Sequence, residues 1–386
     1  MALPKVIFNI AKDGLGGLVN PGTKVPGLII TGATVADGVT IGETYQVFTL
    51  QEAEELGIDE ANNAFAHQHI KAFYNEAGNG TALWLMLVSD ATDMMTMLST
   101  DTLAQKLIAD AKGAIRILGV ISQVTSTIDE GLDIDVHRAV PEAQALAEYF
   151  EEKYMPFRVL ISGTQFNGTV ADLKDYTEAG FNKVACIIGN EDASAYGAIG
   201  LALGREAATP VQRKLSRVKS GPVLNFEAYL TDGDTTESKT DQWEAIDDKG
   251  YIFFRSFAGR SGYYFTNDKT LTSTTDDFRI LANGLVMDKA LIIAYNVLVD
   301  ELSDEVLIAE NGNIHPALIK NWQSNLETNI EQLMVANGEL SAVKAIIEPE
   351  QNVLQNGKVE INLQLLPVGY ADFIEVNIGF TTEIQN

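Results

Sequence analysis

The sequence predicts an α/β fold with a mostly parallel sheet and flanking helices, followed by an α+β region. Short apolar runs alternate with amphipathic helical segments between residues 81 and 208, which is typical of parallel strands joined by helices that cover both faces of a sheet. After residue 251, long helical segments precede a group of strands. A strand-like segment at each end of the chain is attached through glycine and proline, so we also expect extended amino- and carboxyl-terminal β-strand arms.

The first region gives its elements in a regular order. Most of its strand segments are apolar throughout, as expected for strands buried on both faces, and its helical segments place apolar residues three and four positions apart. The expected strands are residues 28–35, 44–50, 81–88, 114–121, 157–163 and 183–189. The expected helices are residues 51–58, 59–78, 101–113, 140–154, 171–180 and 193–208.

The second region begins after a polar, acidic stretch, residues 229–250, which we interpret as a linker. Its second helix has Pro316 in its first turn and Gly338 at its end, both usual signals for helix boundaries. The expected helices are residues 277–302 and 311–340, and the expected strands are 251–257, 263–266, 343–349, 358–367 and 373–380. The predicted domains are therefore residues 1–26 (arm and linker), 27–228 (α/β), 229–250 (linker), 251–366 (α+β) and 367–386 (hinge and strand).

Both terminal segments have the alternation of a β-strand. The apolar positions are Val6, Phe8 and Ile10 at the amino end, and Phe373, Ile374, Val376, Ile378 and Phe380 at the carboxyl end. The adjoining hinge residues are Gly14, Gly16 and Gly17, and Pro367 and Gly369. A lone apolar strand has to pair with a sheet edge. Each strand therefore either folds back onto its own domain or is donated to a neighbouring copy.

Composition excludes several classes of function. A net charge of −26 over 386 residues argues against nucleic-acid binding, which needs a basic surface. No apolar run reaches the length of a membrane span, and the first ten residues lack the features of a signal peptide. The single cysteine, Cys186, lies in an apolar run and fits synthesis in a reducing cytoplasm. One segment is basic, with Arg205, Arg213, Lys214, Arg217 and Lys219; it is either a solvated loop or a contact with an acidic neighbour.

No active site emerges from the residues. The loops after the strands contain neither a dinucleotide fingerprint nor a P-loop, and no G-x-S-x-G elbow is present. Gly197, Gly200 and Gly204 share one face of an expected helix, which indicates close packing. The four histidines lack metal-ligand spacing. We therefore predict no catalytic residue, cofactor or metal, although an α/β fold leaves a cytoplasmic enzyme acting on a small molecule as the alternative.

Several segments, in order along the chain, resemble the tail sheath proteins of contractile phage tails and related contractile injection systems. In the first segment Leu56-Gly57 ends a short helix, and in the second Phe73-Tyr74-Asn75 and Gly78 precede a core strand. The resembling segments are residues 47–58, 70–88, 195–214, 251–290 and 314–340. The chain departs from the family where Glu76-Ala77-Gly78 replaces Asn-Gly-Gly and where an arginine-rich strand is replaced by the apolar LWLMLV. These departures suggest a minimal, divergent sheath.

The resemblance implies a structural role without enzymatic activity. Sheath subunits assemble helically around a tail tube and contract to drive the tube through a target envelope, and they pass terminal strands to adjacent copies. The implied partners are further copies of the chain, the tail tube protein, and baseplate and tail terminator proteins, without nucleic acid or a membrane span. The implied location is the virion tail, assembled in the bacterial host cytoplasm.

Overall fold

A computed structural model describes residues 24–99, 101, 103–351 and 353–376 of the chain. The chain forms two compact units, the first ending at Leu302 and the second beginning at Ser303. Some residues of the predicted terminal strands and hinges lie outside the described residues: Val6, Phe8, Ile10, Gly14, Gly16, Gly17, Ile378 and Phe380.

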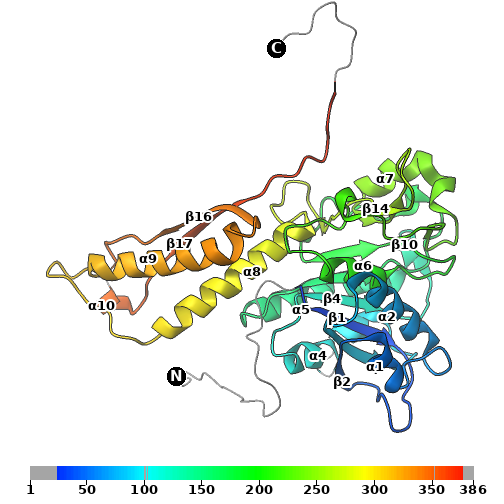
Figure 1. Cartoon of the computed structure of the whole chain (residues 1–386), viewed down its shortest axis with the longest axis horizontal. Coiled ribbons are helices and arrows are strands. Elements are labelled where there is room, and N and C mark those ends of the chain that lie inside the picture. Colours follow the sequence, from blue (N-terminus) through cyan, green and yellow to red (C-terminus); the bar gives the residue numbers. More distant parts are fainter. Residues whose placement is uncertain (1–23, 100, 102, 352, 377–386) are drawn as a thin grey trace, which may run out of the picture. The chain divides into compact units, whose positions relative to one another are not determined.

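The first unit is built on a seven-stranded sheet with the order β12-β9-β7-β4-β1-β3-β2. Figure 1 labels three of its strands, β1, β2 and β4. Strand β2 is antiparallel to β3, and all other neighbours in this sheet are parallel. Its strands are β1 (Pro26–Thr31), β2 (Thr44–Val47), β3 (Leu83–Val88), β4 (Ile117–Ile121), β7 (Arg158–Ser162), β9 (Val184–Ile187) and β12 (Tyr251–Ile252). The prediction of a mostly parallel sheet is confirmed.

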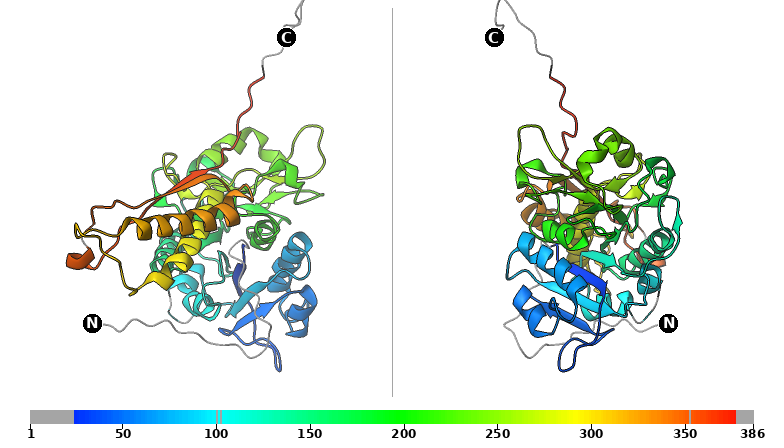
Figure 2. Two further views of the ribbon diagram at one scale, coloured as in Figure 1. Left: turned by 60° about the vertical axis from the view of Figure 1, so that its left-hand side comes forward. Right: turned by 90° about the vertical axis from the view of Figure 1, so that its right-hand side faces the viewer.

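Helices cover both faces of this sheet. Helices α2 (Ala64–Ala77) and α6 (Ile199–Ala207) pack on one face, while α4 (Ala104–Asp110) and α5 (Ile134–Glu151) pack on the other (Figure 2). Alternate strand residues divide between the two faces, because successive side chains of a strand point in opposite directions. In β4, for example, Leu118 and Val120 join the core beneath α4 and α5, whereas Gly119 faces α6. The short helices α1 (Leu50–Glu55) and α3 (Met94–Ser99) contact α2 and α5, respectively.

Small residues allow α6 to pack closely on α2, as the sequence predicted. A Cβ atom at Gly200 would lie 2.0 Å from the carbonyl oxygen of His69, and one at Gly204 would lie 2.6 Å from that of Phe73. Gly197 lies before the first turn of α6, because the helix begins at Ile199 rather than at residue 193. There a Cβ atom would meet the carbonyl oxygen of Ile187.

Short elements complete the first unit. They are β5 (Ile128–Asp129), β6 (Leu132–Asp133), β8 (Gly180–Phe181), β10 (Gly189–Asn190), β11 (Tyr229–Leu230), β13 (Phe254–Arg255), β14 (Tyr264–Phe265), β15 (Leu271–Thr272), η1 (Val170–Asp172), η2 (Val218–Ser220) and η4 (Val299–Glu301). The helix expected at residues 171–180 is wrong. Leu173 and Tyr176 are buried there from irregular backbone, and the Tyr176 hydroxyl bonds to His137.

The acidic stretch 229–250 is folded into the first unit instead of forming a linker. It contains β11, the 3₁₀ segment η3 (Thr236–Gln242) and α7 (Trp243–Asp248). Its Lys239 is buried and pairs with Asp232 at 2.6 Å and Asp234 at 3.1 Å. Immediately afterwards β12 joins the edge of the main sheet beside β9. Lys239 thus neutralises part of the negative charge of the stretch to which it belongs. Composition alone does not reveal this pairing.

Helix α8 (Leu281–Leu298) is attached to the main sheet by a buried ion pair. Arg158, the first residue of β7, donates from Nε to Asp288 Oδ2 at 2.8 Å and from Nη2 to Oδ1 at 2.6 Å. Gly284 leaves room for the guanidinium group, since a Cβ atom there would lie 2.6 Å from Arg158 Cζ. The segment Leu281–Glu301 is long and apolar enough to cross a membrane, but half of it is buried. The buried ion pair identifies α8 as a core helix.

The second unit consists of a helix packed on a β-hairpin (Figure 1). Its elements are α9 (Pro316–Ile330), the π-helical turn η5 (Glu331–Val335), β16 (Leu340–Ile346), α10 (Val353–Asn356) and β17 (Asn362–Pro367). Its apolar core contains Ile314, Ile319, Trp322 and Ile347. Pro316 occupies the first turn of α9, as predicted, and His315 caps the helix by accepting from the Ala317 N–H at 3.2 Å.

Candidate assembly surfaces

Hydrogen bonds join the loops at the carboxyl end of the parallel sheet. In open α/β sheets a ligand binds where the strand order reverses, which here is beside β1 and β4. At that point the backbone N–H of Gln123 donates to Thr31 Oγ1 at 3.1 Å, and Tyr196 donates to the Gln123 carbonyl oxygen at 3.2 Å. Ser122 donates to the Thr92 carbonyl oxygen at 2.7 Å. These polar groups hold the loops at the carboxyl ends of β1 and β4 together.

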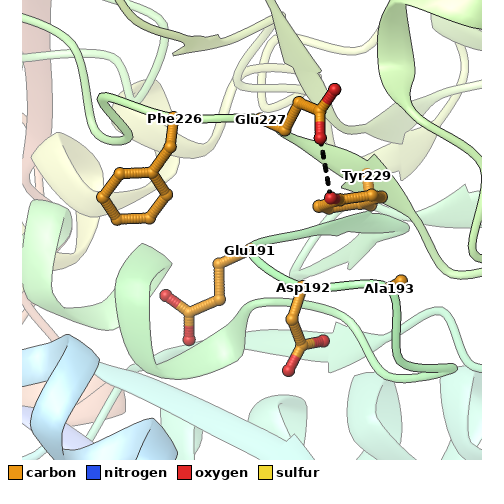
Figure 3. A pocket seen from close by; sticks show the side chains of 6 residues that line it. All are labelled: Glu191, Asp192, Ala193, Phe226, Glu227 and Tyr229. Atoms are coloured by element: carbon orange, nitrogen blue, oxygen red, sulfur yellow. Dashed lines mark hydrogen bonds between the residues drawn. The ribbon is translucent and has the colours of Figure 1, made fainter.

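A pocket of about 300 Å³ lies on the first unit and is shown in Figure 3. Glu191 and Asp192 form one side, and Phe226, Glu227 and Tyr229 form the other; the Tyr229 hydroxyl donates to Glu227 at 3.0 Å. Burial, reinforced by Asp192, raises the pKa of Glu191 to about 7. The pocket can attract a cationic group. Within the described residues no cluster of three or more histidine, cysteine, aspartate or glutamate side chains is arranged to hold a metal ion.

Three histidines of the first unit and the cysteine lie in contacts that stabilise the fold. His67 contacts Glu54 at 2.9 Å, and His137 contacts Tyr176 at 2.8 Å. His69 is buried, and burial lowers its pKa to about 4. Cys186 is also fully buried, and burial raises the pKa of its thiol well above the usual value. A thiol in this state is a poor nucleophile.

The basic segment is only partly available to a neighbour. Arg205 is 3% exposed; it pairs with Glu76 and donates to the carbonyl oxygens of Gly221 and Pro222 at 3.0 and 3.1 Å. Arg205 therefore stabilises the fold of its own chain, and the prediction that it contacts a neighbouring copy is wrong because its side chain is buried. The side chains of Arg213 and Lys219 are exposed, whereas those of Lys214 and Arg217 are half-buried. The remaining intersubunit contacts stay a prediction.

A buried ionic cluster, not predicted from the sequence, holds the start of the described chain. The side chains of Lys24 and Glu206 form an ion pair and are 0% and 1% exposed. Asp268 is also buried, and it accepts from the backbone N–H of Leu215 at 3.0 Å and of Ala282 at 2.9 Å. Burial, together with the charge of Glu206, raises the pKa of Asp268 to about 7. The cluster joins residue 24 to α6, to the basic segment and to the start of α8.

The hairpin of the second unit is followed by an exposed apolar segment. Strands β16 and β17 form a two-stranded antiparallel sheet among the described residues, and α9 packs against it. A sheet of two strands needs such a packing partner to be stable. After β17, residues 368–376 have neither helix nor strand structure. Phe373 is 97% exposed, Ile374 79% and Val376 67%. Residues 373–376 of the predicted carboxyl-terminal strand therefore have no strand partner in the described part of the chain.

Comparison with solved structures identifies the fold. A chain of the anti-feeding prophage (AFP) baseplate aligns with a TM-score of 0.61 and 16% identity over 100% of both chains. A chain from the same baseplate in its contracted state gives 0.57 and 14%, over 98% of both chains. A sheath tail protein from Listeria innocua gives 0.51 and 9%, over 90% of this chain and 96% of that one.

The fold is thus that of tail sheath proteins. Residues 3–269 match the DUF2586 N-terminal domain and residues 277–385 match the DUF2586 C-terminal domain, so the chain belongs to the DUF2586 family. A comparison with curated proteins gives no significant match.

Proposed function

We propose that this chain is the structural subunit of a contractile tail sheath. Copies polymerise helically around a tail tube and contract to drive the tube through the envelope of a target cell. The agreement of fold over the full length of an AFP baseplate chain supports this proposal most strongly, because that baseplate has also been solved in a contracted state. The partners we propose are further copies of the chain, the tail tube protein, and baseplate and tail terminator proteins. Its location is a virion tail assembled in the bacterial cytoplasm.

In this proposal the terminal strands connect neighbouring copies. The segments before Lys24 and after Pro367 act as arms, because Lys24 is buried and Pro367 ends β17. Their apolar strands add to a sheet edge of an adjacent copy by β-augmentation. The exposed side chains of Phe373, Ile374 and Val376 support this role, since an apolar strand without a partner is unfavourable in water. Pro367 and Gly369, and the glycines at 14, 16 and 17, serve as hinges between rigid cores and paired strands.

Electron microscopy of purified protein tests the proposal. Full-length chain should form tubes in a concentration-dependent manner. Variants lacking residues 1–12, or all residues after Leu366, should remain folded by circular dichroism but should form no tubes. A full-length protein that stays monodisperse at every concentration would contradict the sheath assignment, and truncated proteins that still form tubes would contradict the role of the arms.

A further inference from the structure

One arginine of the β13–β14 hairpin is partly buried without a partner for its charge. Arg255, in β13, lies opposite Tyr264 of β14. Its side chain is half-buried, and its Nε is enclosed without a hydrogen-bond acceptor. Among the described residues, no carboxylate or carbonyl oxygen bonds to its guanidinium group. A cation that is partly withdrawn from water needs a compensating acceptor, so this group is suited to one supplied from elsewhere.

Two aromatic rings hold this guanidinium group in position. Arg255 Cζ lies 4.5 Å from the ring centroid of Phe257 and 5.8 Å from that of Trp243, which are distances of cation–π contacts. The Trp243 indole N–H donates to the Thr236 carbonyl oxygen at 2.9 Å. The Phe257 ring meets the Tyr264 ring edge-on, with 5.3 Å between their centroids. Both rings are thus fixed, and they orient the cation without supplying a counter-ion.

The hairpin that carries Arg255 is basic and reaches the surface. Residues 251–265 contain Arg255, Arg260 and no acidic residue. Arg260 lies in the loop between the two strands and is exposed. The whole chain contains 53 acidic residues against 27 lysines and arginines. Carboxylates are therefore the charged groups that another copy presents most abundantly, and the positive hairpin attracts them.

We infer that Arg255 and Arg260 bind a carboxylate side chain on the surface of a second copy of this chain. The two oxygens of a carboxylate match the planar, forked N–H groups of a guanidinium group. Because the rings already hold Arg255 in place, little side-chain freedom is lost when the contact forms. Arginine beside aromatic rings is also typical of residues that dominate the binding energy of an interface. The inference rests on the proposed function, and it adds a contact site and the chemistry of its ligand.

Removal of the guanidinium group tests the site. In Arg255→Met an unbranched apolar chain remains over the two rings, while the charge and the N–H groups are lost. The protein concentration needed for tube formation, measured by light scattering, should rise about tenfold. The matched control is Arg138→Met, because Arg138 is an exposed arginine of α5 outside the hairpin. This control should assemble as the unmodified chain does.

Two further measurements separate the contact from a role in folding. Below the assembly concentration, Arg255→Met should melt at the same temperature as the unmodified chain, because methionine keeps a favourable contact with the aromatic rings. Arg260→Met changes only an exposed side chain, and it should raise the concentration needed for tube formation severalfold.

The possible outcomes distinguish this contact from the proposed function. If the unmodified chain forms tubes and both hairpin variants assemble like Arg138→Met, the inference fails while the sheath assignment stands. A lower melting temperature of Arg255→Met, with normal assembly of Arg260→Met, would make Arg255 a structural residue and would also overturn the inference. Absence of tubes from the unmodified chain rejects the proposed function, on which this contact depends.

Cross-linking identifies the ligand. Arg255→Lys places an amine in the site, and a water-soluble carbodiimide joins an amine to a carboxylate that contacts it. Subunits of this variant with ordinary and with heavy nitrogen are mixed, assembled and cross-linked, and their peptides are analysed by mass spectrometry. Cross-linked peptides that combine one light and one heavy partner should identify an aspartate or glutamate of the neighbouring copy. Cross-links only within single chains, or none because a free anion such as phosphate fills the site, would overturn the choice of ligand.

Discussion

At the scale of single residues, the first unit depends on charges that are buried rather than on surface ion pairs. Arg158 and Asp288 are 2% and 1% exposed at the side chain, and Lys24 and Glu206 are equally inaccessible. Bringing such groups out of water is costly, and each member stabilises the fold only while its partner is present. These positions should therefore respond to substitution far more strongly than exposed charges do.

Removing one member of the Arg158–Asp288 pair should leave the other charge buried without compensation. Arg158→Met is expected to lower the free energy of unfolding by about 3–5 kcal/mol, measured by urea denaturation. The matched control is Lys71→Met, whose pair with Glu60 is 3.5 Å long and exposed; it should cost about 0–1 kcal/mol. Equal effects at the two positions would contradict the structural role of the buried pair.

Asp268 should make stability depend on pH. Its pKa is raised to about 7 in the folded chain, whereas an unfolded aspartate titrates near 4. Between these values the folded state holds a proton that the unfolded state releases, so stability decreases as pH rises from about 4 to 7. In Asp268→Asn, the decrease in the free energy of unfolding between pH 5 and 8 should be smaller by on the order of 1–3 kcal/mol. Urea unfolding at a series of pH values measures it.

The control for this experiment is Asp175→Asn. Hydrogen bonds from Thr177 lower the pKa of Asp175, so both folded and unfolded states are ionised there above pH 5. This substitution should leave the slope between pH 5 and 8 unchanged. If Asp268→Asn also left it unchanged, Asp268 would be ionised in the folded chain throughout this range.

At the scale of secondary-structure elements, the sequence predicts correctly those strands that are completely buried. The strands β1, β3, β4, β7 and β9 are buried on both faces, so they appear as apolar runs that cannot be mistaken for surface segments. β12 is only two residues long and follows an acidic stretch that resembles a linker. For this reason the predicted domain boundary lies at residue 250, whereas the first unit extends to residue 302. In the second unit, Gln323 donates to the Ala345 carbonyl oxygen at 3.1 Å, and the Ala345 N–H donates to Glu327 Oε1 at 2.9 Å. These bonds could not be predicted, because they depend on the packing of α9 against β16.

The contact between α2 and α6 gives a prediction at this scale. Gly200→Ala should be destabilising by about 1–3 kcal/mol, because its Cβ would lie 2.0 Å from the His69 carbonyl oxygen and the helices would have to separate. Gly180→Ala is the matched control, since nothing lies within 4 Å of the corresponding Cβ. Thermal unfolding compares the two variants, and similar melting temperatures would show that α6 can shift without cost.

At the scale of the whole molecule, assembly has to bring together subunits that each have a net charge of −26. Basic side chains should then meet acidic surface on neighbours. Arg213 and Lys219 are exposed in the basic segment, and Asp241, Glu244 and Asp248 are exposed in the acidic stretch. We propose these groups as the electrostatic contact between copies, with Lys214 and Arg217 nearby.

Charge reversal tests this contact. Arg213→Glu combined with Lys219→Glu should raise the protein concentration needed for tube formation severalfold, and added salt should reduce the difference between variant and unmodified chain because it screens exposed charges. Lys71→Glu, which reverses an exposed charge on α2, is the control. Light scattering against protein concentration provides the measurement. Identical assembly curves for all three proteins would leave the segment as a solvated loop.

The order of the strands has a consequence for how the chain is made. β1 lies in the interior of the main sheet, yet the edge strand β12 leaves the ribosome only after residue 252 has been added. At bacterial translation rates of about 5–20 residues per second, roughly 10–45 s separate the synthesis of these two strands. The seven-stranded sheet can therefore be completed only late in synthesis, and the interior strand β1 has to wait for its outer neighbours.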